Sequence, residues 1–156
     1  NATISVDPVH SKTLPDLVTK LLAARQESLV LFHKLAALKP FAPAAPAQHL
    51  LQRFRQTLVD YLALGPFEVY QALEEQPADS PYRQARELAR RLSLPRPLST
   101  QAALDFHDRY DGDLSGPALA ELDAELSRLG EQLAVRIALE DRIMAAVRTG
   151  DARIAA

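Results

Sequence analysis

Apolar residues recur three and four positions apart along most of this 156-residue chain, and no segment keeps the apolar–polar alternation of a β-strand for long. This periodicity predicts helices over about 14–38, 47–64, 66–75, 79–92, 99–111 and 117–147. Long amphipathic helices joined by short connectors are typical of bundles. We therefore expect an all-α fold: a single-domain antiparallel helical bundle of about six helices with a long C-terminal helix.

Prolines and glycines predict where these helices end. Three prolines between residues 40 and 46 predict an extended connector after the first helix. Gly65 is expected to close the second helix in the left-handed conformation, and Pro66 to open the third. We expect residues 1–13 to form a flexible N-terminus, with residues 1–2 as a cloning remnant. Residues 14–148 would then form the folded domain and residues 149–156 a frayed tail.

The longest helix carries its apolar stripe through two charged positions. The stripe comprises Leu119, Leu122, Leu126, Leu129, Leu133, Ile143 and Val147. Arg136 and Glu140 fall on the same stripe, and Arg25 falls on the inner stripe of the first helix. Charges on a core-facing stripe must be paired or hydrogen-bonded. We therefore predict that Arg25, Arg136 and Glu140 form a structural polar network.

Composition and motifs argue against catalysis and metal binding. The chain has no cysteine and a net charge of −2. It has no glycine-rich phosphate loop and no nucleophile paired with a base, so we expect no enzyme and no cofactor. The Glu-x-x-His pairs of di-iron bundles are missing, and His107 with Asp111 gives only a weak two-ligand pattern. We expect no metal site. A secretory leader and a run of 18 apolar residues are also missing, which favours a cytoplasmic protein.

Aromatic and acidic residues concentrate around the Gly65–Pro66 corner: Asp60, Tyr61, Phe67, Glu68 and Tyr70. Tyrosine favours interfaces because it is apolar with a polar tip. This concentration predicts a surface that binds a partner. For Tyr61 and Phe67, packing in the core is an equally good interpretation.

Basic residues concentrate in one segment, which contains Arg83, Arg86, Arg90, Arg91 and Arg96. At helical spacing three of them share a face that could meet phosphate or an acidic partner. No aromatic residue lies between these arginines, as it would in a single-strand nucleic-acid binder, so a solvated face is favoured.

Three blocks of the sequence resemble the Rsd/AlgQ family. The segment 58–70, LVDYLALGPFEVY, resembles that family's LVDYxSxGHFxxY. The segment 104–108, LDFHD, resembles its aromatic–acidic turn, and 129–142, LGEQLAVRIALEDR, resembles its closing helix, LGExLExRxxLEDxL. Together the blocks extend the resemblance over about residues 14–147.

The resemblance implies an all-helical bacterial anti-sigma factor. Members of the family bind the primary sigma factor of RNA polymerase, chiefly its domain 4, and limit its use by the polymerase. Domain 4 is a helix-turn-helix module with a basic DNA-binding face, which suits an acidic and aromatic surface. Carried over by position, Asp60 and Tyr61 are the leading contact candidates, with Phe67, Glu68 and Tyr70 beside them.

Some positions depart from the family pattern. Thr19 and Leu21 stand where the family commonly has an acidic residue and a tryptophan. Pro66 replaces a histidine, and Ala63 a serine. Two other functions stay open: a carboxylate-rich, metal- or oxygen-handling helical bundle, and an adaptor that regulates another enzyme.

Overall fold

The computed structural model describes residues 13–42, 45–93, 97–112, 114 and 116–156, and all regular structure in these ranges is helical. The helices are α1 (Leu14–Ala36), α2 (Ala45–Leu64), η1 (Gly65–Val69), α3 (Tyr70–Glu74), α4 (Arg83–Ser93), α5 (Pro97–Arg109) and α6 (Gly116–Ala155). Because α2, η1 and α3 follow one another without a break, they form one continuous segment. The described residues thus make five continuous helical segments, and the predicted all-α bundle is confirmed.

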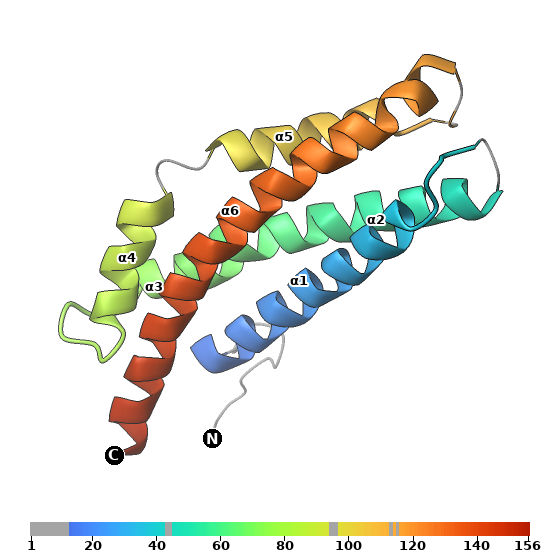
Figure 1. The fold of residues 1–156 in the computed structure, drawn as a ribbon. Helices are drawn as coiled ribbons and strands as arrows, with labels where there is room; N and C mark the ends of the chain where they lie inside the picture. The colour runs from blue at the N-terminus through green and yellow to red at the C-terminus, as the bar shows by residue number, and fades with distance from the viewer. Residues whose placement is uncertain (1–12, 43–44, 94–96, 113, 115) are drawn as a thin grey trace, which may run out of the picture.

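Helix α6 organises the bundle. It has 40 residues, about 60 Å at the rise of an α-helix. Its first half packs along α5 and its second half along α4, while α1 and α2 form an antiparallel pair on its other side (Figure 1). No helix in the described part of the chain is both long and apolar enough to cross a membrane.

The core follows the predicted stripes. Leu51, Phe54 and Leu58 of α2 are fully buried, and so are Leu122 and Ile143 of α6. Four rings join α1, α2 and α5 through this core, with neighbouring centroids 4.8 to 5.9 Å apart. These rings belong to Phe32, Phe54, Phe106 and Tyr110.

The predicted helix break at Gly65 is wrong. Gly65 does not have a positive φ, and the chain stays helical through Pro66. Proline has no N–H for the carbonyl four residues back, so a regular α-helix would lose a bond here. The helix instead widens into a π-helical turn, in which the Tyr70 N–H donates to the Gly65 carbonyl. The expected third helix is therefore a continuation of the second.

The C-terminal end also differs from expectation, because α6 does not end near Val147 but continues to Ala155. In this last part of α6, Gly150 packs against Tyr82 so closely that an added Cβ would meet the ring at 2.5 Å. The Tyr82 hydroxyl donates to the next residue, Asp151. The expected flexible segment 1–13 lies outside the described residues except for Thr13, whose hydroxyl caps α1 by accepting from the Asp16 N–H at 3.3 Å.

Candidate functional site

The predicted contact residues lie on one continuous helical segment, but they divide between surface and core. Asp60 is exposed and accepts a hydrogen bond from the Gln56 amide at 3.3 Å. Phe67 is 77 % exposed. Glu68 is partly exposed and forms an ion pair with Lys20 of α1, with 3.3 Å between Nζ and Oε1. At a rise of 1.5 Å per residue, Asp60 and Phe67 lie about 10 Å apart along the helix axis.

Tyr61 and Tyr70 point the other way, into the bundle, and are 1 % and 9 % exposed. Tyr61 therefore packs in the core, which was the alternative interpretation for both residues, whereas Phe67 does not. The surface that a partner could touch is formed by Asp60, Phe67 and Glu68. We call these three residues the η1 surface.

Beneath Asp60, the Tyr61 hydroxyl donates to Glu140 of α6, which is fully buried. Burial, followed by the charge of Glu140 and this hydrogen bond, raises the pKa of Tyr61 far above its ordinary value. The phenol therefore stays protonated and serves as a donor. The guanidinium carbon of Arg136 lies 5.7 Å from the centroid of the Tyr61 ring.

Two arginines complete this buried network. Arg136 is 2 % exposed, and its Nε lies 3.4 Å from Oε2 of Glu140, an ion-pair distance without hydrogen-bond geometry. Its Nη1 donates to the Thr100 hydroxyl of α5 at 3.0 Å. Arg25 reaches in from α1, with Nη1 3.5 Å from Glu140 and 2.8 Å from Asp141. The network joins α1, α2, α5 and α6.

Arg25 lies at the edge of this network. Burial acts to lower the pKa of Arg25, but its hydrogen bond to Asp141 and the charges of Asp141 and Glu140 outweigh that effect, so the pKa is raised. Arg25 is therefore charged at any physiological pH. Its side chain is 18 % exposed, so it connects the buried carboxylate to the surface.

A groove between α1 and α6 was missed by sequence reasoning. It has a volume of about 430 Å³ and is lined by Leu29, Phe32, His33, Gly130, Leu133, Ala134, Ile137, Ala138 and Asp141. Gly130 permits the close approach of Phe32, since an added Cβ would meet Cζ of that ring at 2.8 Å. A glycine in the middle of a long helix was the available signal. Asp141, the partner of Arg25, is one of the residues that line the groove.

The weak His107–Asp111 pattern does not form a cation site. The guanidinium of Arg55 lies against both residues, 3.4 Å from the His107 ring nitrogens and 3.0 Å from Asp111. The positive charge of Arg55 therefore already faces the Asp111 carboxylate. Within the described ranges there is no group of three or more His, Cys, Asp or Glu placed to hold a metal ion.

The two first-helix departures lie in different surroundings. Leu21 is fully buried in the core, and Thr19 is exposed with its hydroxyl donating to the Pro15 carbonyl at 3.0 Å. Lys20, between them, is the residue that reaches Glu68. This part of α1 therefore adjoins the η1 surface through Lys20.

Comparison with known proteins gives a consistent result. Residues 10–148 match the family model described as "Regulator of RNA polymerase sigma(70) subunit, Rsd/AlgQ". A protein named Regulator of sigma D from Enterobacter sp. (strain 638) is 32 % identical over 83 % of this chain and 78 % of its own length. Proteins with the same name from Yersinia pseudotuberculosis and Pectobacterium carotovorum are 31 % and 30 % identical, over 83 % and 82 % of this chain and 78 % and 85 % of their own. No solved structure matches the chain.

Proposed function

This chain belongs to the Rsd/AlgQ family of regulators of the RNA polymerase sigma(70) subunit, and from that premise we propose that it is an anti-sigma factor. It binds the primary sigma factor, chiefly through domain 4, and so limits the use of that factor by RNA polymerase. It acts in the cytoplasm, where the polymerase works, and by stoichiometric binding without catalysis.

The observation that carries this proposal is the exposure of Phe67 between two carboxylates. Phe67 is 77 % exposed, the highest value among the large hydrophobic residues of the described chain. Large aromatic side chains are usually buried in a folded domain and are enriched at interfaces. A phenylalanine left in solvent on an ordered helical turn supports a role in binding.

The charges of the η1 surface indicate the kind of partner. Asp60 has no ion pair with any residue that the structure describes. Among the described residues, Glu68 pairs with an exposed lysine, Lys20, a contact that is worth little and is easily exchanged. Both carboxylates are therefore available to cations. A helix-turn-helix module presents arginines and lysines on the face that meets DNA phosphates, so it offers the complementary charge.

The same contact gives the mechanism of regulation. If the η1 surface covers the basic face of domain 4, that face cannot contact promoter DNA. Phe67 would supply apolar area at the centre of the contact, and Asp60 and Glu68 would take the place of phosphates. Tyr61, lying beneath Asp60 and bonded to Glu140, would hold this part of the helix in a fixed orientation.

Titration of the protein with sigma domain 4 tests the proposal, comparing wild type with Asp60→Arg. A charge reversal opposite a desolvated arginine should weaken association by about 2 kcal/mol, or about 30-fold in Kd. Asp105→Arg is the matched control. Asp105 is also an exposed helical aspartate, and it also accepts a hydrogen bond from a glutamine one turn earlier, Gln101.

The proposed function is wrong if the wild-type protein, at micromolar concentrations, binds neither domain 4 nor any longer piece of the primary sigma factor. Binding that Asp60→Arg leaves unchanged, or that Asp105→Arg weakens equally, would keep the function and remove the η1 surface from it.

A further inference from the structure

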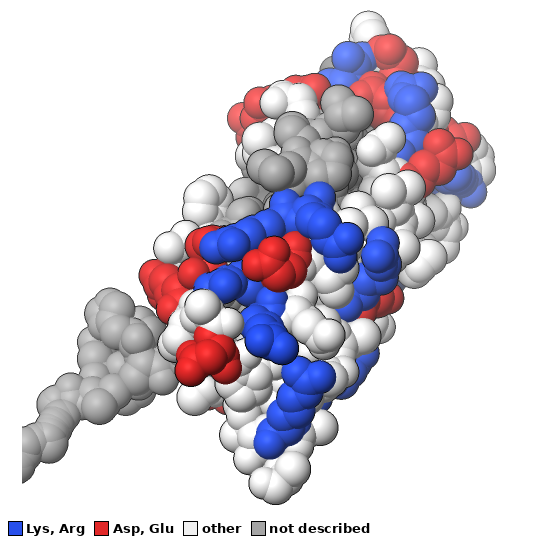
Figure 2. All heavy atoms as spheres, turned by 90° about the vertical axis from the view of Figure 1, so that its left-hand side faces the viewer, with Lys and Arg blue, Asp and Glu red and all other residues white. Residues whose placement is uncertain are grey.

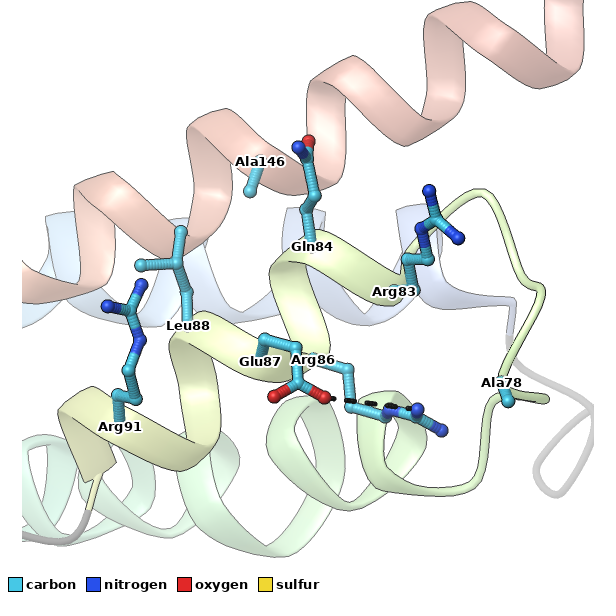
Figure 3. A pocket seen from close by; sticks show the side chains of 8 residues that line it. All are labelled: Ala78, Arg83, Gln84, Arg86, Glu87, Leu88, Arg91 and Ala146. Atoms are coloured by element: carbon cyan, nitrogen blue, oxygen red, sulfur yellow. Dashed lines mark ion pairs between the residues drawn. The ribbon is translucent and has the colours of Figure 1, made fainter.

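The second half of α6 and helix α4 enclose a hollow that the proposed function does not use. Its volume is about 480 Å³, within the range of small-molecule sites. The lining residues are Ala78, Arg83, Gln84, Arg86, Glu87, Leu88, Arg91 and Ala146 (Figure 3). Figure 2 shows basic side chains gathered on this face of the molecule, with acidic side chains among and beside them.

The arginines of α4 fall into two pairs. Arg86 and Arg90 serve the fold: Arg86 donates to the Gln76 carbonyl at 2.7 Å, and Arg90 is bound to Glu74. Arg83 and Arg91 are exposed and make no hydrogen bond or ion pair with any described residue. Two guanidinium groups are therefore free to bind a ligand.

The two free arginines flank the hollow. Positions 83, 87 and 91 share one face of α4, and eight residues separate its ends by about 12 Å along the axis. Figure 3 shows Arg83 and Arg91 on opposite sides of Leu88 and Glu87. Arg142, also exposed and without an ion pair in the described ranges, lies on α6 one turn before Ala146. Guanidinium groups bind phosphate through parallel hydrogen bonds, which lysine cannot form.

The middle of the hollow differs from its ends. Leu88 and Ala146 give it an apolar floor between the helices. Glu87 stands beside this floor, with its charge balanced by Arg90 at 3.4 Å and Arg86 at 4.0 Å. A balanced carboxylate still accepts hydrogen bonds, and carboxylates of this kind bind the hydroxyl groups of ribose in nucleotide sites.

We propose that this hollow binds a nucleoside diphosphate or a closely similar phosphorylated ligand. Its phosphates would be bound by the free arginines, its ring would lie on Leu88 and Ala146, and its hydroxyl or amino groups would donate to Glu87. A nucleic-acid strand fits less well, because none of the described residues that line the hollow is aromatic and could stack on successive bases. The site does not rest on the proposed function, since it shares no residue with the η1 surface.

Calorimetric titration with ADP, GDP, CDP, UDP and inorganic pyrophosphate, each alone and in the same buffer, tests the proposal. Pyrophosphate carries the same phosphate groups without the nucleoside, so it measures attraction to the arginines alone. We expect at least one nucleoside diphosphate to bind ten-fold or more tightly than pyrophosphate. If all four bind no better than pyrophosphate, the proposal is wrong and the surface only attracts anions.

Variants then locate the site. Arg83→Gln and Arg91→Gln should each weaken binding of the best nucleotide by about ten-fold, and both residues are exposed, so the fold should be unaffected. Arg53→Gln of α2 is the control, since Arg53 is likewise exposed and without an ion pair in the described chain. If all three variants lose the same affinity, the nucleotide is attracted by the overall charge of the protein, and the proposed site is wrong. A nucleotide that binds wild type and both α4 variants equally would do the same.

Discussion

Glu140 is the residue whose replacement should damage this fold most for the smallest change in shape. Glu140→Gln keeps the size of the side chain and an acceptor for the Tyr61 hydroxyl, but it removes the carboxylate charge. Arg136, 2 % exposed, then loses its ion pair with the Glu140 carboxylate. Removing one partner of a buried pair costs about 3–5 kcal/mol, because the remaining charge stays buried without the opposite charge that balanced it.

The comparison with Asp141→Asn separates the effect of burial from the effect of ion-pair distance. Asp141 pairs with the same helix α1 through Arg25, at the shorter distance of 2.8 Å, but its side chain is 55 % exposed. A surface pair contributes at most about 1 kcal/mol. If distance decided the energetics, Asp141→Asn would be the more harmful change; if burial decides, Glu140→Gln will be worse by about 2 kcal/mol or more.

Urea unfolding followed by circular dichroism measures both variants, with equal m-values required for the comparison. The double variant Arg136→Met/Glu140→Gln completes a cycle, since it removes both buried charges together. We expect it to lose at least 2 kcal/mol less than the sum of its two single variants. Additive losses, or a Glu140→Gln variant within 1 kcal/mol of wild type, would refute the account of Glu140 and Arg136 as a mutually compensating pair.

Three further predictions concern the C-terminal end and the η1 surface. Gly150→Ala should destabilise the protein by about 1–3 kcal/mol in thermal unfolding, because the added Cβ would meet the Tyr82 ring at 2.5 Å. Burial and the bond to Asp151 raise the pKa of Tyr82 from 10.0 to about 12. The stability that this phenol contributes is therefore fully present below pH 10 and is lost as the pH rises to 12. Tyr82→Phe should make the free energy of unfolding fall less steeply between pH 10 and pH 12 than it does in wild type. An equal fall in the two proteins would contradict this. Phe67→Ser should change stability by less than about 0.5 kcal/mol while weakening sigma binding at least ten-fold, whereas Val135→Ser, at 60 % exposure, should leave binding unchanged.

Much of the fold could be predicted because periodicity records burial directly. The stripe of α6 ran through Arg136 and Glu140, and both side chains lie in the core at 2 % and 0 % exposure. Their partners on other helices, Tyr61 and Thr100, could not be predicted, because helical spacing says nothing about which faces meet. The same limit hid the groove beside Gly130.

Local signals failed where a second interaction outweighed them. Taken by themselves, Gly65 and Pro66 indicate the end of a helix. In the folded chain, however, Val69 and Leu73 are both fully buried and keep this segment packed against the bundle. The extension of α6 past Val147 likewise depends on Tyr82, which comes from a distant part of the chain. Among the predicted contact residues, only exposure could separate Phe67 from Tyr61 and Tyr70, and exposure is a property of the folded chain.

The widened turn at η1 affects how the η1 surface could change in evolution. The turn closes between residues five apart, one more than in a regular α-helix, so it accommodates one additional residue. Removing one residue from it would restore regular helical bonding and leave the helix beyond it close to its present rotation. Val69 and Leu73 would then stay on the inner side, so the outward side chains of this turn can change in number without repacking the core beneath them.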